Sequence, residues 1–406
     1  MDSLTTAAAR ALASADPLGA LNLIALRDDA PALALRGIAM AQLGDLARAK
    51  LLLRRAARSF GAKEAVGRAR CIVAEAEIAL VSRELNWPVK ALDAARTTLE
   101  RHGDRANAAH ARNLAIRRLV LIGHIDAAEK QLSGFDPTSL PPALRAAHEL
   151  VIAGIALRRL RTKPARAALA QAKRAARRAH IPPLIAEVES AALVLTTPAA
   201  RLIMRGSEKS LRLDAVEALL ASKTLVVDAC RHVVCLAGRT VSLQTRPVLF
   251  ALARTLAEAW PGEASRAALL ARAFRAKHAD ESHRARLRVE IGRLRKTIRD
   301  VADIAATKDG FVLVPHRIRD VAVLAPPTDD DHAAVLALLS DGEAWSSSAL
   351  ALALGASQRT VQRALDGLAA SNKVRPIGRA RARRWMTPPL PGFSTSLLLT
   401  AALPAG

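Results

Sequence analysis

The residues best suited to chemistry in this sequence are the basic side chains crowded between positions 284 and 299. In this stretch Leu287, Ile291, Leu294 and Ile298 recur at helical spacing and predict one buried stripe. The other faces carry Glu290 as their only carboxylate and the following cations: Arg284, Arg286, Arg288, Arg293, Arg295, Lys296 and Arg299. Arginine can donate two hydrogen bonds to a guanine edge, and neighbouring cations neutralise phosphates. The chemistry indicated is recognition of double-stranded DNA by a helix in the major groove.

Strands and helices around this stretch would have to position the basic helix. Three runs rich in β-branched residues predict a small antiparallel sheet, at 225–229, 232–237 and 240–243. Three helices are expected to follow it, at 246–259, 265–274 and about 281–300. Residues 307–314 then predict a hairpin with Asp309-Gly310 in its turn.

The basic helix and the hairpin divide the expected DNA contacts between them. We expect Arg286, Glu290 and Arg293 to face the groove, where Glu290 either accepts from a cytosine amine or orients a neighbouring arginine. The DNA backbone contacts are expected from Arg284, Arg295 and Lys308, and the full set adds Arg288 and Lys296. The alternative is a basic helix that is only solvated.

Several short motifs of residues 223–315 follow one known pattern. Leu243 with Pro247 opens the first helix, and Ser265-Arg266 opens the second. The third helix contains Ile291-Gly292-Arg293-Leu294-Arg295-Lys296, and Gly310-Phe311 lies in the hairpin. With these motifs the segment resembles the winged-helix DNA-binding domain of the OmpR/PhoB family. The resemblance implies a recognition helix at 281–300, but no receiver domain precedes it, so phosphorelay control is not implied.

A second set of motifs lies near the C-terminal end. Helices are expected at 332–340, Ser348–Leu354 and Gln358–Ala370, with Ser357 as the N-cap of the last. The last helix leaves five polar side chains for base edges: Gln358, Arg359, Thr360, Gln362 and Arg363. A basic wing follows, with Gly378 near its tip and these expected DNA contacts: Arg379, Arg381 and Arg383. The segment resembles the winged helices of GntR-, DeoR- and MarR-like regulators. Dimerisation or protein docking is the alternative role.

The first two hundred residues repeat a helical pattern. In residues 33–58 the small Gly37, the turn Gly44-Asp45 and Ala49 predict two closely packed antiparallel helices. The pattern recurs with Ala91, Ala128 and Ala167, at intervals longer than the roughly 34 residues of a regular tetratricopeptide repeat. We therefore expect a TPR-like array that binds a protein or peptide. A non-repetitive helical bundle remains the alternative.

Composition limits the remaining possibilities. The net charge of +24 favours a nucleic-acid partner, and the aromatic content of 2% with no Tyr indicates cores of Ala and Leu. Three Cys and no long apolar run indicate a reduced cytoplasmic protein that is associated with the nucleoid and does not span a membrane. Cys230, His232 and Cys235 do not share one face of a strand, so no metal is expected. No catalytic constellation and no cofactor motif is found, so an enzyme is not expected.

Together these patterns predict a mainly α protein with two small winged helix-turn-helix (α+β) domains. The expected divisions are a TPR-like domain at 1–220, winged helices at 221–320 and 326–388, and a tail at 389–406. The expected function is that of a bacterial-type, sequence-specific DNA-binding transcription regulator, controlled through the TPR-like domain. The alternative is a protein–protein adaptor whose winged helices dock proteins. A homodimer is compatible with either function.

Overall fold

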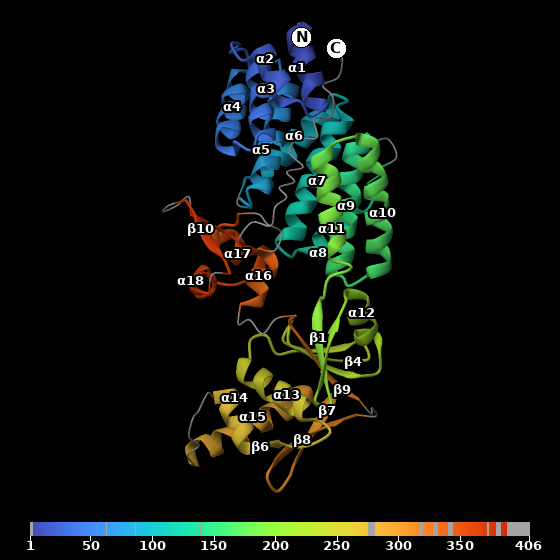
Figure 1. Ribbon diagram of the computed structural model, residues 1–406, viewed down its shortest axis with the longest axis vertical. Coiled ribbons are helices and arrows are strands. Elements are labelled where there is room, and N and C mark those ends of the chain that lie inside the picture. Colours follow the sequence, from blue (N-terminus) through green and yellow to red (C-terminus); the bar gives the residue numbers. More distant parts are fainter. Residues whose placement is uncertain are drawn as a thin grey trace. The chain divides into compact units, whose positions relative to one another are not determined.

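The computed structural model in Figure 1 divides the chain into two compact units. The sheet unit comprises Leu193–Ala333, and the helical unit comprises Met1–Ala192 together with Ala334–Gly406. The structure describes residues 3–61, 63–85, 87–135, 137, 140–274, 281–316, 320–327, 332–339, 344–371, 373–378 and 383–387. These residues are mainly helical with a few small sheets, so the prediction of a mainly α chain is confirmed.

Eleven helices of the described residues form the N-terminal part of the helical unit, which we call the array. Helices that follow one another along the chain pack together, because each has an apolar face that only a neighbour can cover. Their bounds are α1 Ser3–Ala13, α2 Pro17–Ile24, α3 Ala30–Gln42, α4 Leu46–Ser59, α5 Ala65–Val81, α6 Val89–Arg101, α7 Arg105–Leu121, α8 Ile125–Leu132, α9 Pro142–Arg158, α10 Thr162–Ala179 and α11 Pro182–Leu193.

The hairpin of α3 and α4 shows how small residues set the spacing of the array. A Cβ added at Gly37 would lie 2.9 Å from the Cγ of Leu53, so the glycine allows the two helices to approach closely. Gly44 adopts a φ of +87°, which few other residues tolerate, and thereby ends α3. Asp45 then caps α4, since its side chain accepts a hydrogen bond of 3.0 Å from the Arg48 amide.

The alanines that suggested a repeat are not all used in the same way. Ala49 and Ala128 are fully buried between helices, as the spacing predicted. Ala167 is exposed, so the fourth alanine of the series was wrongly chosen. In α10 the buried small residues include Ala165 and Ala168 instead, because these positions face the neighbouring helix.

The sheet unit contains a six-stranded sheet in the order β2-β1-β9-β3-β4-β5 and a three-stranded sheet in the order β6-β8-β7. The strands are β1 Ala200–Met204, β2 Ser207–Leu211, β3 Leu225–Asp228, β4 Val233–Leu236, β5 Arg239–Ser242, β6 Ala264–Ser265, β7 Ala302–Ala306, β8 Gly310–Pro315 and β9 Val321–Ala325. Strand β9 pairs parallel with β3 and antiparallel with β1, and all five of its residues are buried. Together with β3 it therefore forms the centre of the larger sheet.

Four helices complete the sheet unit: α12 Leu213–Ala221, α13 Pro247–Ala259, α14 Arg266–Phe274 and α15 Glu281–Ile298. The predicted strands at 225–243 and the three helices after them are present, with ends that differ by a few residues. The unit begins earlier than expected, because residues 200–221 form β1, β2 and α12 and not the end of the array. The expected hairpin at 307–314 spans 302–315, and Gly310 lies in β8 rather than in the turn.

The last described part of the chain, which we call the C-terminal module, contains three helices and two short strands. These are α16 Ala333–Leu339, α17 Ser347–Leu354, α18 Gln358–Ala370, β10 Arg375–Ile377 and β11 Arg384–Met386. Ser357 caps α18 as predicted, by accepting a hydrogen bond of 3.1 Å from the Thr360 amide. Trp345 and Trp385 are buried in one cluster with Leu92 of α6, so the module shares its core with the array. No helix among the described residues has the length and apolar character needed to cross a membrane.

Candidate nucleic-acid interface

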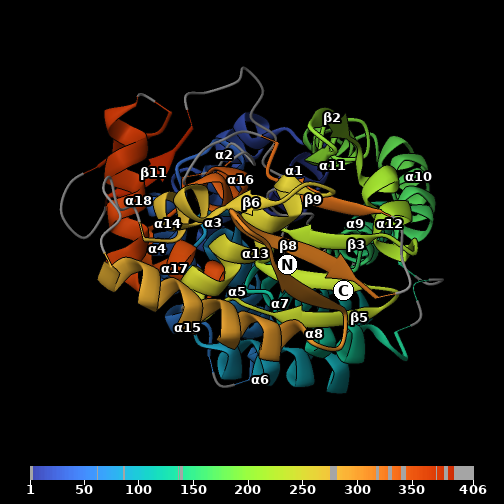
Figure 2. The ribbon, with the colours of Figure 1, turned by 90° about the horizontal axis from the view of Figure 1, so that it is seen from below.

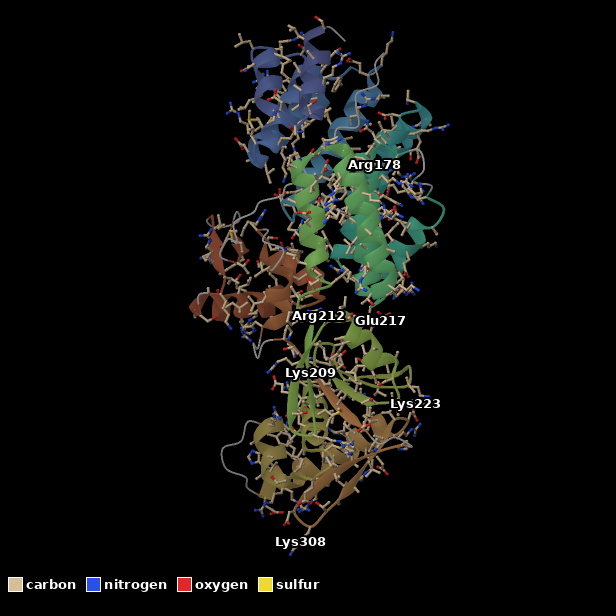
Figure 3. The ribbon with its side chains drawn as sticks, turned by 45° about the vertical axis from the view of Figure 1, so that its right-hand side comes forward. Arg178, Lys209, Arg212, Glu217, Lys223 and Lys308 are labelled. Atoms are coloured by element: carbon tan, nitrogen blue, oxygen red, sulfur yellow. The ribbon has the colours of Figure 1, made fainter. Side chains whose placement is uncertain are left out.

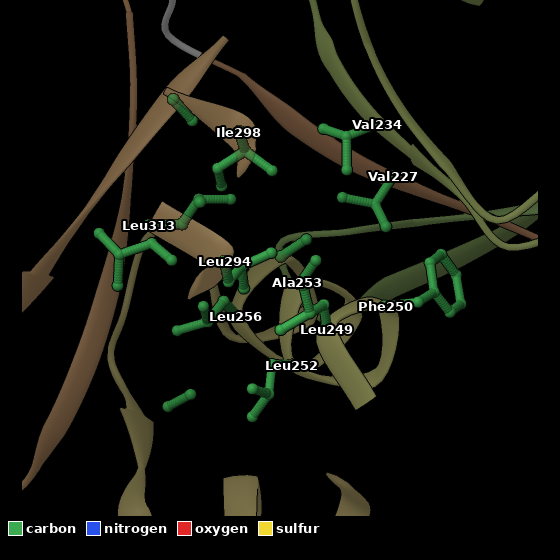
Figure 4. Close-up of a cluster of buried hydrophobic side chains, with 14 of the residues drawn as sticks. Val227, Val234, Leu249, Phe250, Leu252, Ala253, Leu256, Leu294, Ile298 and Leu313 are labelled. Atoms are coloured by element: carbon green, nitrogen blue, oxygen red, sulfur yellow. The ribbon is translucent and has the colours of Figure 1, made fainter. Parts of the chain in front are cut away.

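Helix α15 is anchored by the apolar stripe that its sequence predicted. Leu287, Ile291, Leu294 and Ile298 are each at most 2% exposed and belong to the core of the sheet unit. Figure 4 shows Leu294 and Ile298 in this core near Leu256 of α13. The helix is the long one at the lower left of Figure 2. Because its stripe is held by the other elements of the unit, the opposite face is presented outwards.

The outward face of α15 combines cations with one apolar side chain. Arg286, Arg293 and Lys296 are exposed on the side opposite the buried stripe. Val289 lies among them at helical spacing and is 54% exposed. An exposed valine can contact a thymine methyl group in the major groove. Sequence reasoning overlooked Val289, although its position three residues after Arg286 and off the stripe was the available signal.

Glu290 lies beside this face and is paired within the helix. Its Oε1 lies 2.7 Å from Nη1 of Arg293, one helical turn away, and its side chain is only 13% exposed, compared with 65% for Arg293. Of the two roles considered for Glu290, the geometry favours orientation of the arginine. Holding the guanidinium in one rotamer reduces the entropy that a base contact would cost.

Four other arginines of α15 contact residues of the sheet unit, and the guanidinium of one of them, Arg286, lies 4.7 Å from the centre of the Phe274 ring. Arg295 donates from Nε to the Ile304 carbonyl oxygen at 3.0 Å, so it fastens the helix to β7. This contact holds the guanidinium at the hairpin while the side chain stays 45% exposed, so its contact with the DNA backbone stays a prediction. Arg284 and Arg288 both lie near Glu281, with N–O distances of 3.6 and 3.5 Å, and remain largely exposed.

The turn between β7 and β8 is fixed by the arginine of the Ser265-Arg266 motif, for which the sequence predicted only a place at the start of a helix. Arg266, at the start of α14, donates to the carbonyl oxygens of Thr307 (3.0 Å) and Lys308 (2.6 Å). Its guanidinium also lies 5.6 Å from the centre of the Phe311 ring. Figure 3 shows Lys308 at the tip of this turn, where its side chain is exposed. The hairpin therefore presents one cation on a rigid support.

Helix α18 exposes four of the five predicted reading residues, with Gln362 half-buried, but several of these side chains are bonded within the module. Arg359 and Arg363 are exposed, and the hydroxyl of Thr360 lies 2.8 Å from that of Ser357. Gln358 and Gln362 are bonded inside the C-terminal module: Gln358 donates to the Ser347 hydroxyl at 3.0 Å, and Gln362 donates to a carboxylate oxygen of Asp366 at 2.9 Å. The two arginines are therefore the strongest candidates for contacts outside the chain.

The basic wing of the C-terminal module is only partly described. Arg379 and Arg381 lie outside the described residues, while Gly378 has the positive φ of +75° expected of a residue near the tip. Arg383 lies 5.3 Å from the centre of the Trp385 ring. Arg384 in β11 pairs with Glu84 of the array at 3.2 Å, so one cation of the wing contacts protein.

Two of the three residues considered for a metal site contact other side chains. His232 packs against Phe250 with ring centres 4.5 Å apart, and the Cys235 sulfur lies 3.7 Å from the Thr240 hydroxyl. Across the described ranges, no group of three or more His, Cys, Asp and Glu side chains could hold a metal ion.

Comparisons with protein-family models, with curated proteins and with solved structures found no match to this chain.

Proposed function

We propose that the protein is a DNA-binding transcription regulator and that its sheet unit is a winged helix resembling the OmpR/PhoB type. The observation that carries the proposal is the outward face of α15, which bears Arg286, Val289, Arg293 and Lys296, while the one carboxylate beside them, Glu290, is 13% exposed and the exposed Glu281 lies at the first residue of the helix. A solvated helix would be expected to mix charges of both signs on this face. A helix of this width also fits the major groove.

In the proposed complex α15 lies in the major groove. Arg286 and Arg293 donate to guanine edges, and Val289 contacts a thymine methyl group. Glu290 holds Arg293 in its reading conformation. Lys308, at the tip of the β7–β8 hairpin, contacts a phosphate or the adjacent minor groove.

The C-terminal module is proposed as a second winged helix that reads DNA through α18. Its exposed Arg359 and Arg363 have the spacing i, i+4, so both lie on one face of the helix. The array is proposed as a TPR-like domain whose surface receives a protein or peptide. In this scheme the array controls the two DNA-binding modules.

One experiment separates this function from a merely basic surface. A duplex selected from a random library is titrated with the full chain at several salt concentrations, and the same is done with Arg286→Ala/Arg293→Ala. We expect log affinity to fall with log salt by about 0.9 per phosphate contacted. The double variant should lose roughly 1–3 kcal/mol per arginine on the selected duplex.

The matched control is Arg10→Ala/Arg58→Ala, which removes the same charge from exposed positions on α1 and α4. It should leave affinity for the selected duplex within about twofold of wild type, given the modest effect expected of distant surface charges at physiological salt. If duplex binding is absent, or if both double variants lose affinity equally, base reading by α15 is refuted.

A second candidate is an adaptor whose winged helices dock proteins. It is favoured by one observation, namely that the C-terminal module already covers part of the array with Trp345, Trp385 and Arg384. An adaptor would show no steep salt dependence with duplex DNA. It would be supported if the α15 double variant weakened binding of a protein partner and had no effect on DNA.

A further inference from the structure

A pocket of about 440 Å³ opens inside the helical unit, between the array and the C-terminal module. Its walls come from α4, α5, α6 and the segment before α6, together with the start of α17 and strand β11. This volume is in the range of sites that bind small organic molecules. The pocket is separate from α15, and the exposed arginines of α18 do not line it.

The charges around this pocket do not balance. The Glu84 carboxylate pairs with two cations: it lies 2.6 Å from Lys50 Nζ and 3.2 Å from Arg384 Nη2. Arg54 and Glu75 form a second pair at 2.6 Å. The lining therefore carries three cations and two carboxylates, and it would favour a ligand with one negative charge.

Trp87, one of the lining residues, carries a hydrogen-bond donor without a partner. Its Nε1 is buried and has no hydrogen-bond partner, and a buried donor left unpaired costs about 1–3 kcal/mol. Ile72, Leu85 and Leu92 supply apolar wall beside it. A ligand with an acceptor atom and a flat apolar body would satisfy the donor and cover the wall.

We propose that this pocket binds a small aromatic carboxylate. The carboxylate would accept a hydrogen bond from Trp87 and lie near Lys50 and Arg384, while the ring covers the apolar wall. Because the ligand would contact both the array and the C-terminal module, it binds their docked arrangement more tightly and stabilises it. This regulatory consequence, unlike the binding itself, rests on the proposed function, since it predicts that the ligand changes DNA affinity.

The test uses the full chain with 2-naphthoate and its uncharged analogue 2-naphthamide as probes in isothermal titration calorimetry. We expect 2-naphthoate to bind at one site at least tenfold more tightly than the amide. Trp87→Phe keeps an aromatic ring but removes the donor together with the second ring of the indole, and Lys50→Met removes a charge; each should weaken naphthoate binding about tenfold. Lys163→Met, an exposed position on α10, makes the same change as Lys50→Met and should have no effect.

Thermal unfolding of each variant shows whether it is folded. If Lys50→Met does not fold, Trp87→Phe alone still tests the pocket. Equal affinity for the acid and the amide, or no loss in Trp87→Phe, would overturn the pocket assignment.

A second measurement tests the regulatory consequence. Saturating 2-naphthoate should change the affinity of the wild-type chain for its selected duplex at least threefold, and should not do so in Lys50→Met. Naphthoate binding without any change in DNA affinity would overturn the regulatory part. Absence of DNA binding with and without naphthoate would overturn the proposed function and leave the pocket intact.

Discussion

Replacement of Gly310 by Ala should separate two strands of the sheet unit. An added Cβ would lie 2.0 Å from the carbonyl oxygen of Ala264 and 2.8 Å from its carbonyl carbon, and both atoms are backbone. No rotamer change can relieve this contact, so β8 must move away from β6 where Ser265 pairs with Gly310. Overpacking costs about 1–3 kcal/mol and a lost hydrogen bond about 1 kcal/mol, so we expect destabilisation of roughly 2–4 kcal/mol.

Gly292→Ala is the matched control, because it adds the same methyl group in the same unit. Gly292 lies within α15 and has no atom within 4 Å of the added Cβ. Alanine lowers the backbone entropy lost on folding, so this variant should be more stable by about 0.5–1 kcal/mol. The steric contact with Ala264 therefore predicts that the same added methyl group lowers the free energy of unfolding in Gly310→Ala, whereas it raises that free energy in Gly292→Ala.

Hydrogen–deuterium exchange of the full chain measures both effects locally. In Gly310→Ala, amides of β7 and β8 should exchange roughly 30-fold faster or more, as a loss of about 2 kcal/mol requires. Peptides from α9 and α10 in the helical unit provide an internal reference. Unchanged protection of β8 in Gly310→Ala, or destabilisation by both variants alike, would refute the steric argument.

Three further predictions concern charge, pH and packing. Glu290→Gln removes the ion pair with Arg293, so affinity for random duplex should rise up to about threefold while preference for the selected duplex falls; competition binding measures both. Burial, with smaller contributions from two arginines, lowers the pKa of His148 from 6.5 to about 4, so the folded chain holds the neutral ring. The free energy of unfolding should therefore fall by up to about 3 kcal/mol as the pH drops from 6.5 towards 4. In His148→Gln the free energy of unfolding, measured by urea titration, should depend less on pH. Gly37→Ala forces a Cβ against Leu53 and should cost about 1–2 kcal/mol in thermal unfolding followed by circular dichroism; an unchanged transition would contradict it.

Local patterns predicted the elements that carry the candidate interface. The stripe of α15 has a period that only a helix satisfies, and the β-branched runs of β3 to β5 lie close together along the chain. Strand β9 was missed because its residues are buried on both faces, so Val321–Ala325 shows no alternation. Its partner Ala200–Met204 lies far away in sequence, and no local signal indicates such a pairing.

Charge in the sequence could not show how each cation is held within the chain. Arg293 and Arg295 look equivalent in the sequence, yet Arg295 donates to a carbonyl of β7 while Arg293 pairs with Glu290 of its own helix and stays 65% exposed. The same holds for Arg384, which pairs with the array. Which group each arginine contacts depends on where the neighbouring carbonyl and carboxylate oxygens lie. The tertiary structure sets those positions.

The two proposed DNA-binding modules depend on the rest of the chain in different ways. The sheet unit builds its core from its own strands and helices, so the outward face of α15 is set by residues 193–333 alone. The C-terminal module completes its core with α5 and α6 of the array, and Trp345 is fully buried there, with the Arg83 guanidinium 5.3 Å from its ring centre. A change in the packing of these array helices therefore alters the support of α18 directly. On the proposed function, α15 would therefore supply constant DNA affinity, and α18 would supply the part that a ligand of the array adjusts.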